Sequence, residues 1–373
     1  MSCKQPKQQQ KPTAILLPRK KVIAVPKKQI IIPEKKPFVP RKLADIAERV
    51  AKKLEAIPIE KIDFPSDYRL GTVGITQSIF ETFLRCRQCF LFTLNRYEPV
   101  GAKNITAFGS LVHAILDKIY SFTIQEKGRI PTEDMIKRYV QDFRINNREN
   151  FKNIKEADVE LLIGIAFIIL CEYVIYYKED FKLKKWEAVE QVSESMFFGS
   201  KLRRKVDGKY RIAGKKWLME TKTMSRIELE SLLLKLTFDF QNLFYVTCEE
   251  INEPNDPVEG VLYNIIRNPG SKPRNNESLQ DFLQRLRSEI AKNRKYYFMR
   301  YEIPYTQKDK MTFRRELEQQ LEEVAHVLCG ILPVYKNPFA CTGRFTCDFL
   351  PACSSGQLTG YEQRKSLFPE LEV

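Results

Sequence analysis

The sequence predicts an α/β fold in which a mixed central sheet is flanked by helices and carries an α-helical insertion. Residues 201–212 place their apolar and charged side chains on opposite parities, which indicates a half-buried strand. Residues 105–120 instead repeat apolar side chains at helical spacing. Beyond residue 245, strand-like and helix-like segments follow one another. We expect a basic disordered tail at 1–42, a linker with a short helix at 43–73, one α/β domain at 74–353 and a C-terminal tail at 354–373.

The positive charge is concentrated at the N-terminus. Residues 1–42 hold twelve Lys and Arg against one acid, so they contribute +11 of the net +15. They are rich in Gln and Pro and lack a period, which predicts disorder with short extended pieces at Ala14–Leu17 and Gln29–Ile32. Such a tail could contact phosphates without sequence preference, or be a solvated leader, a localisation tail or a docking arm. Because it does not resemble a signal peptide, we expect a cytoplasmic protein in a bacterial or phage-infected cell.

A predicted hairpin brings two carboxylates together. If Ala213 and Gly214 form a two-residue turn, Ile212 pairs with Lys215, and counting back along both strands pairs Asp207 with Glu220. Directly opposite residues have Cβ atoms about 5 Å apart. A bulge would shift this register by one residue.

Two adjacent carboxylates repel each other unless a proton or a cation neutralises them. Oxygen ligands favour Mg²⁺ or Mn²⁺, which activates water and polarises phosphoryl oxygens. Lys222 could orient that water or offset charge on a phosphate. The alternative is an ordinary surface hairpin with mixed charges.

Two predicted helices carry further candidates. On the helix at 105–120, Gly109 and His113 border the apolar stripe, where glycine permits close approach and imidazole could reach a neighbouring site. Gln241 and Tyr245 share one face of a later helix. A packed histidine and a polar helix rim are the simpler interpretations.

Taken in order, these residues resemble the RecB-type branch of the PD-(D/E)XK nuclease superfamily. The resemblance covers residues 74–353 and implies a restriction-endonuclease-like domain. It also implies that the metal is held by His113, Asp207 and Glu220, that Lys222 assists the attacking water, and that Gln241 and Tyr245 border the site and the DNA.

Cysteines suggest a second metal site. Cys341, Cys347 and Cys353 are separated by five residues each, and a helix predicted over 77–90 contains Cys86 and Cys89. One upstream and three downstream thiolates suffice for a 4Fe–4S cluster or a structural zinc.

AddB-type and CRISPR-associated relatives of the resembled family fasten the two ends of the domain with such a cluster. By that resemblance Cys86 is the upstream ligand, with Cys89 as the alternative. The late cysteines depart from the AddB-type spacing, which keeps zinc open. Scattered reduced thiols are the other interpretation, and we expect it for the four remaining cysteines: Cys3, Cys171, Cys248 and Cys329.

The insertion is expected at about 130–182, with helices near 132–147 and 161–177. The second is the most apolar stretch, but it is short for a membrane span and contains Glu172, which favours a buried helix. Further elements are expected as strands at 258–266 and 296–303 and helices at 279–293 and 308–328.

The sequence therefore predicts a metal-dependent deoxyribonuclease, an exonuclease of DNA recombination, repair or phage DNA metabolism. No GxxxxGK[ST] phosphate loop is present, so unwinding would need a separate helicase, and a recombinase is another possible partner. The alternatives are a non-catalytic DNA-binding scaffold and a CRISPR-type adaptation nuclease.

Overall fold

A computed structural model describes residues 57–100, 107–151, 154–342 and 346–372. The basic tail, its two extended pieces and residues 43–56 of the linker lie outside the described residues. The rest of the linker contains one short 3₁₀ helix, η1 (Ile59–Lys61).

The central sheet has six strands and is mixed. Its order is β1-β4-β5-β6-β7, and β3 pairs with β4. The β1–β4 and β5–β6 pairs are parallel, and the other pairs are antiparallel. The strands are β1 (Ile75–Thr76), β3 (Lys185–Phe197), β4 (Ser200–Ile212), β5 (Lys215–Met224), β6 (Val258–Arg267) and β7 (Phe298–Pro304). The predicted mixed α/β architecture is confirmed.

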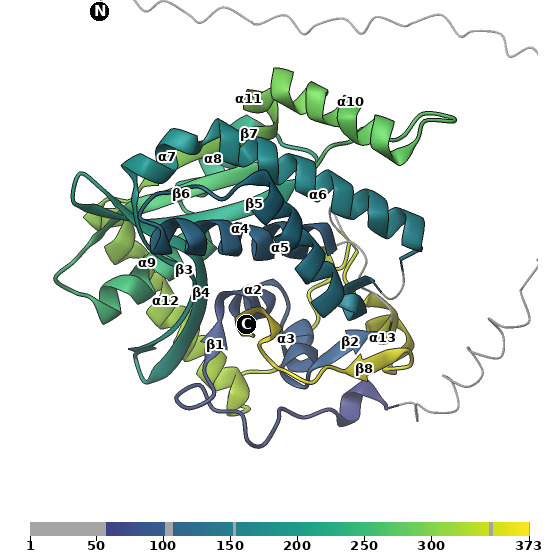
Figure 1. Cartoon of the computed structure of the whole chain (residues 1–373). Helices are drawn as coiled ribbons and strands as arrows, with labels where there is room; N and C mark the ends of the chain where they lie inside the picture. Colours follow the sequence, from purple (N-terminus) through teal and green to yellow (C-terminus); the bar gives the residue numbers. More distant parts are fainter. Residues whose placement is uncertain (1–56, 101–106, 152–153, 343–345, 373) are drawn as a thin grey trace, which may run out of the picture. The chain divides into compact units, whose positions relative to one another are not determined.

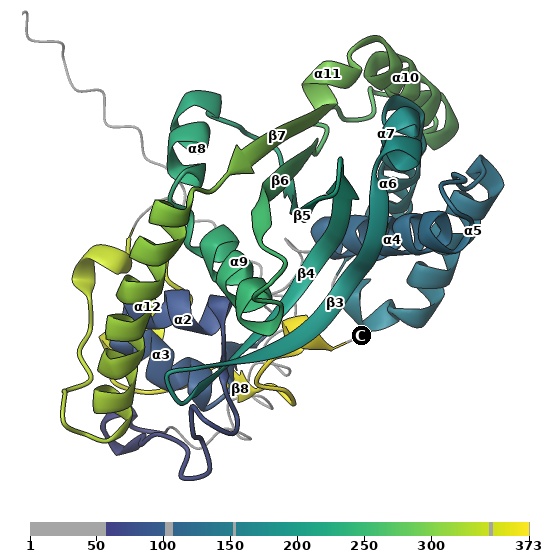
Figure 2. The ribbon, with the colours of Figure 1, turned by 90° about the vertical axis from the view of Figure 1, so that its left-hand side faces the viewer.

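Helices cover both faces of the sheet (Figure 2). One layer contains α4 (Ala107–Gln125), α5 (Glu133–Asn146), α6 (Glu156–Tyr176), α7 (Lys178–Leu183), α10 (Leu279–Lys292) and α11 (Arg294–Tyr297). The other contains α2 (Gln77–Arg85), α3 (Arg87–Leu94), α8 (Leu229–Leu236), α9 (Phe240–Asn252) and α12 (Gln307–Leu328). Alternate strand residues serve the two cores: Leu218 packs on the α9 side and Met219 on the α4 side.

The β4–β5 hairpin forms in the predicted register. Ala213 and Gly214 make the turn, both with positive φ (50° and 79°), as a type I′ turn requires. The ladder runs from Ile212↔Lys215 to Gly208↔Met219. Alternating burial ends at Gly208, because Lys209 is also buried, with its ammonium 3.0 Å from Glu249 of α9. Ile212, expected in the core, is exposed.

The predicted insertion forms α5, α6 and α7. Among the described helices, α6 alone is long and apolar enough to cross a membrane. It is instead half buried in the core, and it contacts α4, α5 and α10 as a core helix does.

Two other helix and strand predictions need correction. The helix expected over 77–90 ends at Arg85; Cys86 is extended, and α3 begins at Arg87. The strand expected from 296 begins at Phe298, because Arg294–Tyr297 is the helical turn α11. The helices expected at 279–293 and 308–328 and the strand expected at 258–266 are confirmed.

The two ends of the described domain meet in a small third core. Strand β2 (Tyr97–Pro99) pairs with β8 (Tyr361–Gln363), and α13 (Leu350–Ser355) lies nearby (Figure 1). Phe92 and Phe349 pack with Tyr361 in this core. Residues expected as a C-terminal tail thus contribute β8 and a 3₁₀ helix, η4 (Pro369–Leu371).

Candidate active site

The predicted site lies where β4 separates from β5. Their ladder ends at Gly208↔Met219, one position before Asp207 and Glu220. The backbone N–H of Thr221 donates to Oδ2 of Asp207 at 2.6 Å. The carboxylate is therefore fixed against the neighbouring strand.

Helix α4 brings His113 to this carboxylate. A Cβ atom added to Gly109 would lie 3.1 Å from Oγ1 of Thr223, so the helix approaches β5 closely there. One turn later, Nδ1 of His113 lies 3.6 Å from Oδ2 of Asp207. Burial is the largest single effect and lowers the pKa of His113, but the charge and hydrogen bond of Asp207, together with the charges of Glu220 and Glu190, outweigh it and raise the pKa above its usual value.

Glu220, Lys222, Gln241 and Tyr245 form one hydrogen-bonded group. Lys222 Nζ donates to Oε1 of Glu220 at 2.5 Å and to Oε1 of Gln241 at 2.8 Å. Nε2 of Gln241 lies 2.9 Å from Oε1 of Glu220 and 3.2 Å from the Tyr245 hydroxyl. The Gln241 amide thus links the acid, the ammonium and the phenol.

Glu220 keeps one carboxylate oxygen without a partner. Its Oε2 is buried and accepts no hydrogen bond from the described residues. Burial raises the pKa of Glu220 to about 7; Lys222 opposes this shift and Asp207 adds to it. A buried, unpaired oxygen beside a second carboxylate is a position that a cation would satisfy.

Glu190 joins the site although the sequence did not identify it. Ligand atoms of His113, Glu190 and Asp207 lie within 4.8 Å of one another, the single such group of three found among the described residues. Burial raises the pKa of Glu190, with a contribution from Asp207. The two carboxylates fit a divalent ion, since carboxylate oxygens are the ligands that suit Mg²⁺ and Mn²⁺.

A second hairpin places Glu190. Phe198 and Gly199, both with positive φ, connect the paired residues Phe197 and Ser200. Counting back from this turn puts Glu190 opposite Asp207. The turn dipeptide Phe198-Gly199 was the sequence signal that could have identified Glu190. Pairing residues outward from that turn, as was done from Ala213-Gly214 to pair Asp207 with Glu220, places Glu190 opposite Asp207.

The cysteines gather only in part. Cys86 lies at the break between α2 and α3, and Sγ of Cys89 lies 3.4 Å from Sγ of Cys347. Hydrogen bonding to Cys89 lowers the pKa of Cys86 to about 5 and that of Cys347 to about 6. Cys353 packs in the same apolar core.

Cys341 is oriented differently: its Sγ donates to the Asn337 carbonyl at 3.5 Å. Within the described part of the chain, the cysteines do not form a set of three mutually close donor atoms. The runner-up Cys89, rather than Cys86, makes the direct sulfur contact with Cys347.

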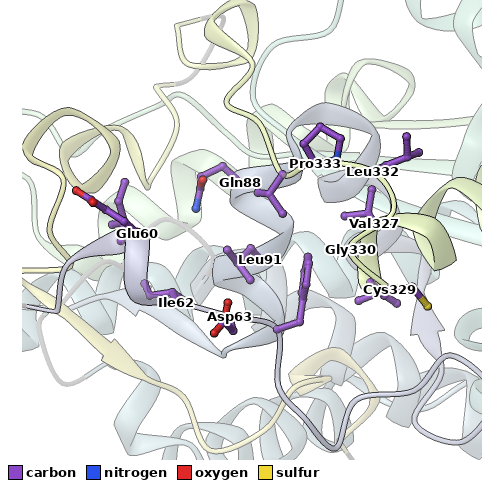
Figure 3. Close-up of a pocket in the computed structure, with 14 residues that line it drawn as sticks. Glu60, Ile62, Asp63, Gln88, Leu91, Val327, Cys329, Gly330, Leu332 and Pro333 are labelled. Carbon is purple, nitrogen blue, oxygen red and sulfur yellow. The ribbon is translucent and has the colours of Figure 1, made fainter.

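A cavity of about 610 Å³ lies elsewhere, between α3, the end of α12 and η1 (Figure 3). Leu91, Val327 and Leu332 contribute to its lining. None of the acidic-site residues borders it, so it adds nothing to the chemistry of that site.

Two solved structures resemble the chain weakly. One is a presumed exonuclease from Eubacterium rectale, with 15% identity, covering 79% of this chain and 91% of that one, at a TM-score of 0.43. The other is the protein SSO0001, with 14% identity, covering 59% of this chain and 96% of that one, at a TM-score of 0.23. Neither score reaches 0.5, so neither likeness supports an argument.

No curated protein matches the chain at a significant level. The sequence model of the PD-(D/E)XK nuclease superfamily matches residues 75–354. That match covers most of the chain and contains every residue of the acidic site.

Proposed function

The chain belongs to the PD-(D/E)XK nuclease superfamily, and on that premise we propose that it is a Mg²⁺- or Mn²⁺-dependent deoxyribonuclease. The observation that carries the proposal is the unpartnered Oε2 of buried Glu220 beside the group of His113, Glu190 and Asp207. A cation would balance this concentration of negative charge.

The divalent ion would be held by Asp207, Glu190, His113 and Glu220. When bound, such an ion lowers the pKa of a water ligand and polarises a phosphoryl oxygen. Thr221 fixes Asp207 through its backbone N–H, which leaves the other carboxylate oxygen, Oδ1, available.

Lys222 supplies the positive charge for the reaction. Its ammonium is held between Glu220 and Gln241, at 2.5 and 2.8 Å. Burial is the largest single effect and lowers the pKa of Lys222, but the charge and hydrogen bond of Glu220, with a contribution from Asp207, outweigh it and raise the pKa, so the group is cationic at neutral pH. An ammonium there would orient the attacking water or offset charge on the phosphate.

Gln241 is assigned to positioning and Tyr245 to the border of the DNA path. The Gln241 amide uses its oxygen for Lys222 and its nitrogen for Glu220. Loss of that amide would free the lysine to rotate away from the acid.

More specifically, we propose that the protein is an exonuclease. It would act in recombination, repair or phage DNA metabolism, with a separate helicase or recombinase as partner. A non-catalytic DNA-binding scaffold is the competing function. The complete set of three acids, a histidine and a lysine favours catalysis, because a binding protein has no need of a buried carboxylate with one oxygen left without a partner among the described residues.

We also propose a metal at the cysteines: a 4Fe–4S cluster, or zinc. Cys347 and Cys353 would be downstream ligands with Cys341, and the upstream ligand would be Cys86 or Cys89. The support is the contact of Cys89 with Cys347 and the lowered pKa of Cys86, since thiolates are the ligand form.

The decisive experiment is cleavage of end-labelled single- and double-stranded DNA, with and without blocked ends, in Mg²⁺, Mn²⁺ or EDTA. We expect metal-dependent release of nucleotides from free ends, abolished by Asp207→Asn. DNA binding without cleavage under every metal condition would instead favour the scaffold. Cleavage of blocked substrates would contradict exonucleolytic action alone.

A further inference from the structure

Three polar side chains lie in register across the core of the sheet. Thr221 on β5 pairs with Asn264 on β6, and Asn264 pairs with Arg300 on β7. Thr221 and Asn264 are fully buried, and the Arg300 side chain is 8% exposed. Burial of such groups is unfavourable unless each finds hydrogen-bond partners.

Hydrogen bonds connect the three residues into one row. Nδ2 of Asn264 donates to Oγ1 of Thr221 at 3.1 Å, and Nε of Arg300 donates to Oδ1 of Asn264 at 3.0 Å. Both ends of the amide are therefore engaged. The row begins at the acidic site, because the N–H of Thr221 holds the carboxylate of Asp207.

The far end of the row reaches helix α4. Nη2 of Arg300 donates to the hydroxyl of Tyr120 at 2.9 Å and to that of Tyr173 at 2.7 Å. Tyr120 lies on α4 two turns after His113. Arg300 also binds Asp180 and stacks on the Tyr177 ring, 3.5 Å from its centroid, which fixes the guanidinium.

We propose that Asn264, Arg300 and Tyr120 are positioning residues that hold α4 against β5, so that His113 and Asp207 remain at ion-binding distance. The inference rests on the proposed function. Apolar packing alone permits a helix to slide on a sheet, whereas directed hydrogen bonds specify one position. Ligand distances must be held within about 0.2 Å for metal binding, so a small displacement of α4 would weaken the site.

Two tyrosines provide a matched test. Tyr120→Phe and Tyr173→Phe each remove one hydroxyl that accepts from Arg300, and each keeps its buried ring. Tyr120 lies on the helix that carries His113, whereas Tyr173 lies on α6, which carries none of the acidic-site residues. The two hydroxyls also hydrogen-bond to each other at 2.7 Å. Each variant therefore removes that bond and one bond from Arg300, so both should lose thermal stability to a similar extent. Only Tyr173→Phe keeps the bond from Arg300 to Tyr120.

The measurement is Mn²⁺ binding to the full-length protein without DNA, by calorimetry and by Mn²⁺ electron paramagnetic resonance. We expect Tyr120→Phe to bind Mn²⁺ up to about tenfold more weakly than wild type, the lower end of the loss when a group bonded to a metal ligand is removed, because Tyr120 acts on His113 only through the helix. Tyr173→Phe should bind like wild type. Asn264→Leu, which removes both amide bonds, should weaken binding as Tyr120→Phe does.

The outcomes separate the two proposals. Wild-type affinity in Tyr120→Phe, or an equal loss in both tyrosine variants, would overturn the positioning role while the metal site stands. If wild type binds no Mn²⁺, or if Asp207→Asn binds Mn²⁺ as wild type does, the proposed function is overturned, and the positioning role with it.

Discussion

The acidic site and the cysteine-bearing region differ in what holds their donor groups. Asp207, Glu190 and Glu220 lie on strands of one sheet, and His113 lies on a long helix packed against it. Cys86 instead lies at a break between helices, and Cys341 and Cys347 flank residues outside the described ranges. The donors of the acidic site are thus held by one sheet and a helix packed on it, whereas the cysteines come from short segments at the two ends of the domain.

The largest effect should follow from a change inside the acidic site. Lys222→Ala removes the ammonium between Glu220 and Gln241, so the rate of DNA cleavage should fall about 10³-fold. DNA binding and melting temperature should change little. Lys215→Ala, on the same hairpin but paired at the surface with Glu259, is the control and should retain full activity. Comparable rates in Lys222→Ala and wild type would remove the assigned role.

Glu190 tests whether the structure identifies a metal-binding residue that the sequence analysis did not. Glu190→Gln should raise the Mn²⁺ concentration for half-maximal cleavage by about tenfold or more, as loss of a metal-binding group does. Glu194→Gln is its matched control on the same strand, since both acids form ion pairs, Glu190 with Lys205 and Glu194 with Lys201 and Arg203, but only Glu190 lies in the acidic site. Equal metal requirements in both variants would exclude Glu190 from the site.

A change in the cysteine region should lower stability, whereas Lys222→Ala in the acidic site should lower activity and leave stability unchanged. Cys347→Ser should lower the melting temperature of anaerobically purified protein by about 5 °C or more, because each kcal/mol corresponds to roughly 2–4 °C in a large domain. It should also remove the bound iron or zinc. Cys171→Ser, a buried cysteine far from this cluster in the fold, controls for the substitution itself. A metal content unchanged by Cys347→Ser would refute the cluster.

The last prediction is a pH dependence of stability that arises in the acidic site. Burial raises the pKa of Glu220 to about 7, so the folded protein retains a proton that the unfolded chain releases above about pH 4.5. In EDTA, the free energy of unfolding of wild type should therefore fall relative to Glu220→Gln as pH rises from about 4.5 through 7, by ~3 kcal/mol at most.

Urea unfolding of both proteins at pH 5 and pH 8 measures this difference. Saturating Mg²⁺ should abolish it, because the ion replaces the proton. A difference that grows in favour of wild type at high pH would have the wrong sign for a buried, protonated Glu220.

The β4–β5 hairpin was predictable because a local turn fixes its register. Ala213 and Gly214 set the pairing of β4 with β5 from Ile212 to Gly208. The alternation of apolar and charged residues identified β4 as a strand, although alternating burial ends at Gly208. Strand β3 was missed because its pairing is irregular between Trp186 and Ala188 and its acids obscure the alternation. The burial of Lys209 could not be predicted, since its partner Glu249 comes from a helix forty residues later.

The cysteine prediction shows a different limit. Spacing identified residues that could share a metal, but it could not choose between Cys86 and Cys89. That choice depends on the extended conformation of Cys86, which splits the predicted helix in two. Helical periodicity carries no information about such a single-residue interruption.

Glu190 has a φ of 45°, a left-handed conformation that disfavours side chains with a Cβ atom. Such strain costs on the order of 1 kcal/mol or more, and glycine would relieve it. A screen for heat resistance alone would therefore favour Glu190→Gly, while discarding a carboxylate proposed to hold the ion. Thermostabilised variants of this chain should accordingly be selected on turnover as well as on survival after heating.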